Sequence, residues 1–383
     1  MQDAVVAALE AWPRTGVPDN PGAWLTTVAR RKALDRIRRE SARTSKEEQA
    51  ASLSLLASDD GEVDGSGSMV RDDVLRLVFT CCHPALSFEA QVALTLRAVC
   101  GLSTDDIAAV FLVPSSTMGQ RITRAKRKIA AARIPYRVPS DHELPDRLPP
   151  VLKVVYAVFT SAHHAPSGPG PVKVDLAAEA LRLARLLHGL VNDEPEVAGL
   201  LALLLATHAR AGARLDDDGR VALLADQDRS RWDHAAIAEA AALIDGALRR
   251  RRPGPYQVQA AISCLHGLAA RWEDTDWPQI VELYDLLLRF EPTAVVALNR
   301  AVAVAEAQGV AEGLAALDGV EGLEDWHLYW STKADFERRL GRWDEAAAAY
   351  GRALACEAND ADRVFLAERL AEVQERARAG AGR

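Results

Sequence analysis

The chain has 383 residues, of which 49% are hydrophobic and 26% are charged, and its formal net charge is −8. This balance predicts a folded protein of two or three domains and excludes a disordered or collagen-like chain. It has only five cysteines, no basic-then-apolar secretion signal and no apolar run of membrane-spanning length. We therefore expect a cytoplasmic protein without a membrane partner.

The charge is unevenly distributed along the chain. Residues 1–140 contain 19 Lys and Arg against 16 Asp and Glu, a net charge of +3. The remaining residues contain 27 against 38, a net charge of −11. Because locally gathered positive charge can bind a polyanion even in an acidic protein, the N-terminal part is where we expect nucleic-acid binding.

The pattern along the chain predicts helices throughout. Ala, Leu, Arg and Glu dominate, and no segment alternates with the period of a strand, which indicates an all-α fold. A first helical block over residues 1–40 is followed by a segment, 41–69, whose Ser, Asp, Glu and Gly content is typical of a flexible linker. A second block covers 70–134, and the prolines between Pro135 and Pro150 are expected to stop any helix. Residues 135–383 form a long C-terminal helical region.

Residues Leu102 to Ile134 have the pattern of a helix-turn-helix. Ser103 and Asp106 predict a capped short helix, and a tight connection leads to Pro114 in the first turn of a second helix. Apolar residues of the second helix follow steps of four, three and four and predict one buried stripe: Met118, Ile122, Ala125 and Ile129. The other side carries Thr117, Gln120, Arg121, Arg124 and Lys128, and no acidic residue follows Asp106 in the segment.

Two interpretations of this basic face stay open on the segment alone. One is the solvated face of an amphipathic hairpin, and the other is a DNA-binding surface. Hydroxyl groups at Ser115, Ser116 and Thr117 favour DNA, because side chains and backbone N–H groups at a helix start can contact phosphates. A second basic helical segment, Asp19–Glu40, favours it further, because two elements joined by a linker can bind two stretches of one duplex.

The last part of the chain contains a weak internal repeat. His327–Asp360 has the layout of a tetratricopeptide unit, with one helix closing at Leu340-Gly341 and small residues in the next helix. Ala294–Val320 repeats this layout, with Gly309 where Gly341 stands, and a poorer copy precedes Pro292. Small residues at such positions let paired helices approach closely and bury a shared core.

Several polar clusters could be mistaken for sites. Cys81, Cys82, His83 and Cys100 could suggest a metal site, but they do not have the usual spacing of metal ligands. The alternative interpretation is that these cysteines are buried thiols. His163-His164 fits the start of a solvated loop, while Leu223–Asp233 fits either a ligand or partner site or an arginine–carboxylate network that ties a loop. With no catalytic motif present, we expect no enzyme, no cofactor and no metal.

The combination of motifs resembles one family. "NPGAWLTTVARRKALDRIRR" resembles the region-two helix with which extracytoplasmic-function sigma factors act on the promoter −10 element. "LSTDDIAAVFLVPSSTMGQRITRAKRKI" resembles the region-four helix-turn-helix that reads the −35 element. With its tetratricopeptide-like tail, the chain resembles the subgroup that carries a large C-terminal extension. This implies a region-two remnant in 1–40, a linker in 41–69, region four in 70–134 and a C-terminal helical domain in 135–383, tetratricopeptide-like from about residue 256.

The resemblance implies a sigma factor that directs core RNA polymerase to promoter DNA, with a C-terminal domain that is a candidate surface for a regulatory protein. The residues that would act on the −10 region are Trp24, Arg30, Arg31, Lys32, Asp35, Arg38 and Arg39. Those that would face the −35 element are Ser115, Ser116, Thr117, Gln120, Arg121 and Arg124, with Lys126, Arg127 and Lys128 on the DNA backbone. Trp24 stays open between strand opening and the core. At a position where the family usually has lysine, this chain has Gly119.

Members of the family have helices ahead of the segment that corresponds to "QDAVVAALEAWP". Region two of this sequence is therefore expected to be incomplete at its N-terminal end. Either the true start lies upstream of Met1 or half of region two is missing. Two other classes remain open. A conventional helix-turn-helix regulator would bind DNA as a dimer without polymerase. In a tetratricopeptide adaptor, the N-terminal basic helices would only be solvated surface.

Overall fold

A computed structural model describes residues 71–111, 113–140, 142–161, 176–214, 222–356 and 360–381. Within these ranges every regular element is an α-helix or a short 3₁₀-helix, which confirms the all-α prediction. The chain divides into two compact units between Pro150 and Val151. No helix of the described ranges is long and apolar enough to cross a membrane.

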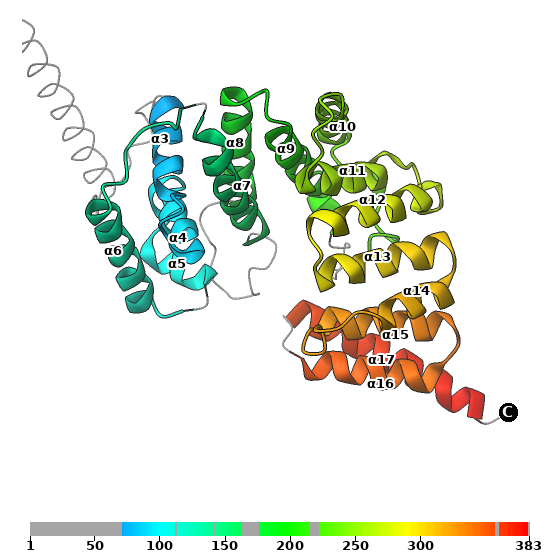
Figure 1. Cartoon of the computed structure of the whole chain (residues 1–383). Coiled ribbons are helices and arrows are strands. Elements are labelled where there is room, and N and C mark those ends of the chain that lie inside the picture. Colours follow the sequence, from blue (N-terminus) through cyan, green and yellow to red (C-terminus); the bar gives the residue numbers. More distant parts are fainter. Residues whose placement is uncertain are drawn as a thin grey trace, which may run out of the picture. The chain divides into compact units, whose positions relative to one another are not determined.

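The N-terminal unit is built around four helices in its described part: α3 (Arg71–Cys81), α4 (Phe88–Ala98), α5 (Thr104–Val110) and α6 (Ser115–Ala131). Its core contains Phe79, Leu94 and Ile107, one from each of the first three helices, all without exposed surface. Gln91 fixes the connection between α3 and α4, because its buried amide donates to the carbonyl oxygens of His83 and Leu86, both at 3.1 Å. The core thus holds the α5–α6 hairpin against α3 and α4 (Figure 1).

Helix α7 (Leu144–Ser161) corrects one expectation, because Pro149 and Pro150 lie inside it rather than stopping it. Pro149 and Pro150 are the sixth and seventh residues of the helix, beyond the first turn, so each removes one helical hydrogen bond. Val151, Val154 and Val155 follow and are fully buried, so burial of this apolar face offsets the missing hydrogen bonds.

The C-terminal unit begins with three helices packed around a fourth. Helix α9 (Pro195–His208) is buried along almost its whole length and contacts α8 (Leu176–Leu190), α10 (His234–Leu248) and α11 (Pro255–Leu268). At Gly199 the backbones of α9 and α11 approach so closely that an added Cβ would lie 2.7 Å from the Gln257 nitrogen. The carboxylate of Glu196 accepts from the backbone N–H groups of Tyr256 and Gln257, both at 3.1 Å, and so caps the start of α11.

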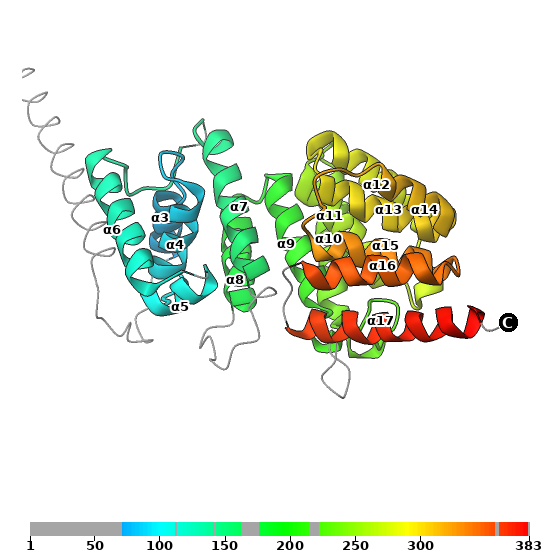
Figure 2. The same cartoon turned by 90° about the horizontal axis from the view of Figure 1, so that it is seen from below.

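Helix pairs follow in chain order. They are α11 with α12 (Trp277–Phe290), α13 (Ala294–Ala307) with α14 (Val310–Asp318), and α15 (His327–Arg339) with α16 (Trp343–Ala355), stacked one after another in Figure 1. Gly309 (φ +132°) and Gly341 (φ +75°) stand at the turns of the last two pairs in backbone conformations that favour glycine. Helix α17 (Asp360–Ala381) lies beside α16 (Figure 2).

Ion pairs join different helices of this stack. The Arg300 Nε lies 2.6 Å from Asp285 of α12, and the Lys333 Nζ lies 2.6 Å from Asp318 of α14. The Arg339 guanidinium on α15 reaches Glu306 of α13 at 2.5 Å. Many charged side chains of the stack are therefore used within the protein.

Candidate nucleic-acid interface

Helix α5 begins with the predicted capping arrangement. The Ser103 hydroxyl accepts from the Asp106 backbone N–H at 3.1 Å, while the Asp106 carboxylate accepts from the Ser103 N–H at 3.2 Å and from its hydroxyl at 2.6 Å. This reciprocal pair satisfies two N–H groups that the helix leaves open. Ile107, fully buried, anchors α5 on the core. The first helix of the hairpin therefore has a defined start and orientation.

The connection to the second helix is tight. The Val113 N–H donates to the Ala108 carbonyl at 3.0 Å, and the Pro114 carbonyl accepts from the N–H groups of Thr117 and Met118. Helix α6 begins at Ser115, so Pro114 is its cap residue and lies one position before the predicted first turn. At that position the missing proline N–H costs no helical hydrogen bond. The turn thus sets the entry of α6 without a glycine.

The predicted stripe on α6 is confirmed. Met118, Ile122, Ala125 and Ile129 are exposed by 0%, 5%, 4% and 3%, respectively. The C-terminal end is closed by Arg133 in the left-handed region (φ 51°), after which the Ile134 N–H donates to the Ile129 carbonyl at 3.1 Å. One face of α6 is therefore fixed against the core over its full length.

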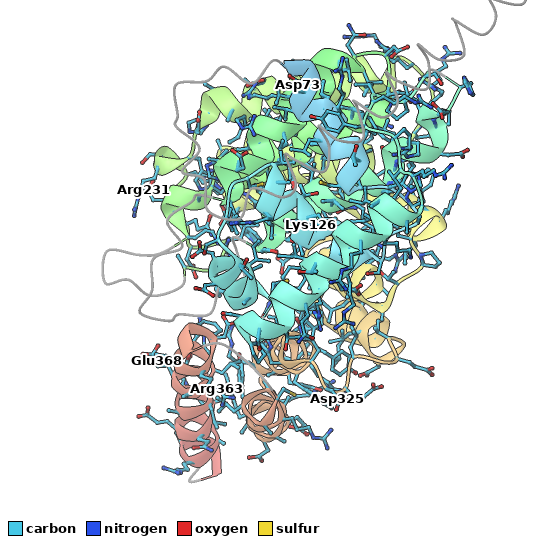
Figure 3. The ribbon with its side chains drawn as sticks, turned by 90° about the vertical axis from the view of Figure 1, so that its left-hand side faces the viewer. Asp73, Lys126, Arg231, Asp325, Arg363 and Glu368 are labelled. Carbon is cyan, nitrogen blue, oxygen red and sulfur yellow. The ribbon has the colours of Figure 1, made fainter. Side chains whose placement is uncertain are left out.

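The opposite face is exposed and basic. Its exposed members among the predicted site residues are Ser115, Ser116, Gln120, Arg121, Arg124, Arg127 and Lys128, while Thr117 and Lys126 are half-buried. Thr123 is also exposed and was not among the predicted site residues, although it lies one helical step of three from Gln120. Figure 3 places Lys126 on this helix, among side chains that project from the ribbon.

The charges of this face are not neutralised by the described part of the protein. Arg121, Arg127 and Lys128 form no hydrogen bond or ion pair with a described residue, and Arg124 makes only a weak one, to the Gln120 side-chain oxygen at 3.4 Å. The helix contains five basic residues and no acidic one. The hydroxyls and free N–H groups at the start of such a helix can bind phosphates. The long basic side chains that follow can bind further phosphates or contact base edges.

The other predicted DNA-binding residues, Trp24, Arg30, Arg31, Lys32, Asp35, Arg38 and Arg39, lie outside the described residues, as do His163 and His164. The structure therefore brings together the residues expected at the −35 element and says nothing of those expected at the −10 element.

The cysteines near α3 are packed as thiols. Cys81 and Cys82 have no exposed surface, and the Cys82 sulfur lies 3.6 Å from the Thr95 hydroxyl. Burial raises the pKa of Cys82 to about 12, so that its thiol stays protonated near neutral pH. In the ranges that the structure describes, no three His, Cys, Asp or Glu side chains are arranged to hold a metal ion.

In the loop 223–233, Arg229 does not bind a carboxylate as an arginine–carboxylate network would require. Arg229 instead donates to two backbone carbonyls at the end of α11, those of His266 at 2.8 Å and Ala269 at 2.6 Å. Asp228 caps the 3₁₀-helix η2 (Arg229–Arg231) through Ser230, and Asp233 caps α10 through the Ala236 N–H at 3.0 Å. Two of the three acids in this segment, Asp228 and Asp233, therefore act as helix caps.

Comparisons with known proteins agree with this geometry. Residues 76–129, which include α4, α5 and most of α6, match the family described as sigma-70, region 4, and residues 1–43 match sigma-70 region 2. Residues 147–248 match a family of unknown function (DUF6596). The uncharacterized protein R00370 of Rhizobium meliloti (strain 1021) is 45% identical over 372 residues, covering 96% of this chain and 88% of that protein.

The helix-turn-helix defines a DNA-binding protein of the transcription machinery. With regions 2 and 4 both matched, the chain belongs to the sigma-70 family. Sigma-70 family proteins are transcription initiation factors, and as a sigma factor this chain directs core RNA polymerase to promoter DNA.

Proposed function

We propose that the chain is a sigma factor of the extracytoplasmic-function type in which α6 reads the −35 element and the C-terminal helices regulate or support transcription. The observation that carries the proposal is the exposed face of α6, which has basic side chains and no acid on a helix whose other face is fixed in the core. A face that was only solvated would not need so uniform a charge, because alternating charges dissolve a helix equally well.

The position of each residue on α6 suggests its role. Arg121 and Arg124 lie one step of three apart on the exposed face of the helix, and a guanidinium can bind the O6 and N7 atoms of a guanine together. Ser115, Ser116 and Thr117 lie at the helix N-terminus, where hydroxyls and N–H groups suit a phosphate. Lys126, Arg127 and Lys128 lie further along the helix and suit the DNA backbone.

The region-two segment is proposed to act on the −10 element. Unstacking a base pair costs on the order of a few kcal/mol, and aromatic and basic side chains that bind the unpaired strand lower this cost. Trp24 is a candidate for stacking on a displaced base, and Arg30, Arg31, Lys32, Arg38 and Arg39 would bind the backbone around it. Asp35, in the same segment, would lie at the strand-opening helix.

The C-terminal unit is proposed to be a tetratricopeptide-like regulatory domain. The support is the series of helix pairs with glycine turns and small buried residues, such as Ala346 and Ala353, where two helices meet. Stacked pairs of this kind form extended binding surfaces for protein partners. A regulatory protein that binds there would link a signal to promoter choice.

The test is transcription from purified core polymerase and the full chain on a promoter obtained by selection from random-sequence duplexes. Arg121→Ala and Arg124→Ala should each reduce discrimination between the selected −35 sequence and a single mismatch by about 5- to 150-fold, since a bidentate base contact supplies about 1–3 kcal/mol. The exposed Arg249 of the C-terminal unit provides the control, Arg249→Ala, with the same loss of charge.

Each other outcome has a meaning. An equal loss of activity on matched and mismatched promoters would make these arginines phosphate contacts only. DNA binding that needs no polymerase, together with failure to co-elute with core enzyme, would favour the helix-turn-helix regulator instead.

A further inference from the structure

The stretch of chain ahead of α3 is strongly acidic. Between Lys46 and Arg71, where α3 begins, the sequence has no Lys or Arg and six acids: Glu47, Glu48, Asp59, Asp60, Glu62 and Asp64. Four of the six fall within residues 59–64, which we call the acidic segment. The segment lies outside the residues that the structure describes, and its last acid, Asp64, precedes Arg71 by seven residues.

Helix α6 presents the opposite charge. It contains five basic residues and no acid, and Arg121, Arg127 and Lys128 are exposed and form no hydrogen bond or ion pair with any described residue. Arg124 lies three residues from both Arg121 and Arg127. Like charges at this spacing lie on the same side of a helix and repel each other. A negatively charged segment along this face would therefore stabilise α6 and have its own charge balanced.

The acidic segment can reach this face. Helix α3 packs against α4 and α4 packs against α6, all within one compact unit that also includes the segment. Packed helices lie about 8–10 Å apart, so two such steps place α6 at most about 20 Å from α3. An extended chain spans up to about 3.6 Å per residue, so the acids lie up to about 25 Å (Asp64) and 40 Å (Asp59) from Arg71.

We propose that residues 59–64 bind the exposed face of α6 in the free protein and there compete with promoter DNA. The carboxylates pair with the guanidinium groups of Arg121, Arg124 and Arg127 and with the Lys128 ammonium, the groups that also suit phosphates. Two observations identify the chain's own segment as the occupant. Its charge is complementary to that of α6, and it ends close enough to α3 to reach that helix.

The contact is expected to be weak and reversible. Exposed ion pairs contribute little individually, but a tethered segment is present at an effective concentration on the order of millimolar. We therefore expect it to lower the affinity of the free chain for DNA by about 3- to 10-fold. Duplex DNA, with one negative charge per about 1.7 Å of its axis, displaces the segment. Any partner that binds the segment elsewhere would free α6 for DNA.

The contact between the segment and α6 does not depend on promoter recognition, but the competition rests on the proposed DNA-binding role of α6. Two measurements on the full chain separate them. One detects the contact directly, and the other measures the affinity for DNA.

The contact is tested with a carbodiimide, which joins a carboxylate directly to an amine. In the full chain at low ionic strength, we expect a cross-link between residues 59–64 and Lys128, identified by mass spectrometry of the digested protein. A duplex with the selected −35 sequence should suppress the cross-link, and so should roughly 0.5 M salt, because salt screens exposed charges. Absence of this cross-link, or a cross-link of Lys128 to Asp216–Asp218 in its place, would overturn the proposal.

The competition is tested by binding of the same duplex to the full chain without polymerase at low ionic strength. Asp59→Asn/Asp60→Asn/Glu62→Gln/Asp64→Asn should bind it about 3- to 10-fold more tightly than the parent. The matched control changes four exposed acids of the C-terminal unit that form no ion pair with a described residue: Glu282→Gln, Glu321→Gln, Glu368→Gln and Glu375→Gln. Both variants change the formal net charge from −8 to −4, so an effect of net charge alone would appear in both.

The results distinguish the two proposals. An equal gain of affinity in both variants, or no gain in the segment variant, would overturn the competition. If the cross-link forms but neither parent nor variant binds the duplex, the contact stands and the DNA-binding role of α6 fails. If the duplex suppresses the cross-link and only the segment variant binds DNA more tightly, both proposals stand.

Discussion

Helix α6 and the helix pairs of the C-terminal unit use their charges in opposite ways. On α6, Arg121, Arg127 and Lys128 are exposed and make no ion pair with a described residue. On α13 and α15, Arg300, Lys333 and Arg339 are held by acids of neighbouring helices. Composition alone does not distinguish these two cases, because both regions are rich in arginine and lysine. The difference lies in whether an acid is within reach.

The comparison shows which charges are available to a partner. A basic residue that already binds a carboxylate has little to offer DNA, whereas an unpaired one on a rigid helix attracts phosphate without first breaking a contact.

The largest effect is expected from His266, a half-buried imidazole that packs against Trp272 and Trp277. The folded-state pKa of His266, about 4, lies below the ordinary value of 6.5, so the unfolded chain binds its proton first as the pH falls. The free energy of unfolding should therefore decrease between pH 6.5 and pH 4, by at most about 3 kcal/mol from this group. Chemical denaturation at several pH values measures the decrease. His266→Phe, which keeps a ring between Trp272 and Trp277, should remove the contribution of His266 to this decrease. The control His234→Phe, at an exposed position, should leave the decrease unchanged.

Alanine substitutions at two glycines test how closely the helices pack in each region. Gly199→Ala should destabilise the protein by about 1–3 kcal/mol, because the added Cβ would lie within 2.9 Å of three atoms of Gln257. On α6, the atom nearest to an added Cβ at Gly119 is 3.9 Å away, so Gly119→Ala should stabilise by up to about 1 kcal/mol through helix propensity. Denaturant titration measures both variants. Equal effects of the two changes would mean that the close approach of α9 and α11 does not exist in solution.

The charges of α6 should govern the salt dependence of DNA binding. If Arg127 and Lys128 contact phosphates, each alanine substitution should weaken binding to all sequences alike and lower the slope of log K against log salt by about 0.9. Binding of the full chain with core polymerase to promoter duplexes, followed over a range of salt concentrations, gives the slope. A slope that does not change would place these two residues away from the DNA backbone.

The smallest effect belongs to the paired charges. Arg339→Ala breaks the contact with Glu306, and because the arginine is about a third exposed the cost should be at most about 1 kcal/mol. The salt slope of DNA binding should stay that of the parent. A change in that slope would show that the helix pairs also contact DNA.

Local signals predicted much of the N-terminal unit. The Ser103–Asp106 cap and the apolar stripe of α6 depend on neighbours in sequence, so spacing was enough to place them. The exposed face of α6 then followed by elimination. Region two was predicted only by resemblance, and its residues lie outside those that the structure describes.

Contacts between distant segments could not be predicted in this way. The prolines at 149 and 150 stay inside α7 because valines that follow are buried by tertiary packing, which overrides local preference. For residues 223–233 the sequence left open a ligand or partner site and an arginine–carboxylate network, and folding brings Arg229 to the carbonyl end of α11, some forty residues away in sequence.

The aromatic residues described above have a practical consequence for spectroscopy. The sequence has eight tryptophans; Trp12 and Trp24 lie near its start, and the other six, from Trp232 to Trp343, all belong to the C-terminal unit. A Trp12→Phe/Trp24→Phe protein would therefore emit tryptophan fluorescence from the C-terminal unit alone. Its emission would report on melting of the helix pairs while circular dichroism reported on the entire chain, so that a difference between the two curves would reveal independent unfolding.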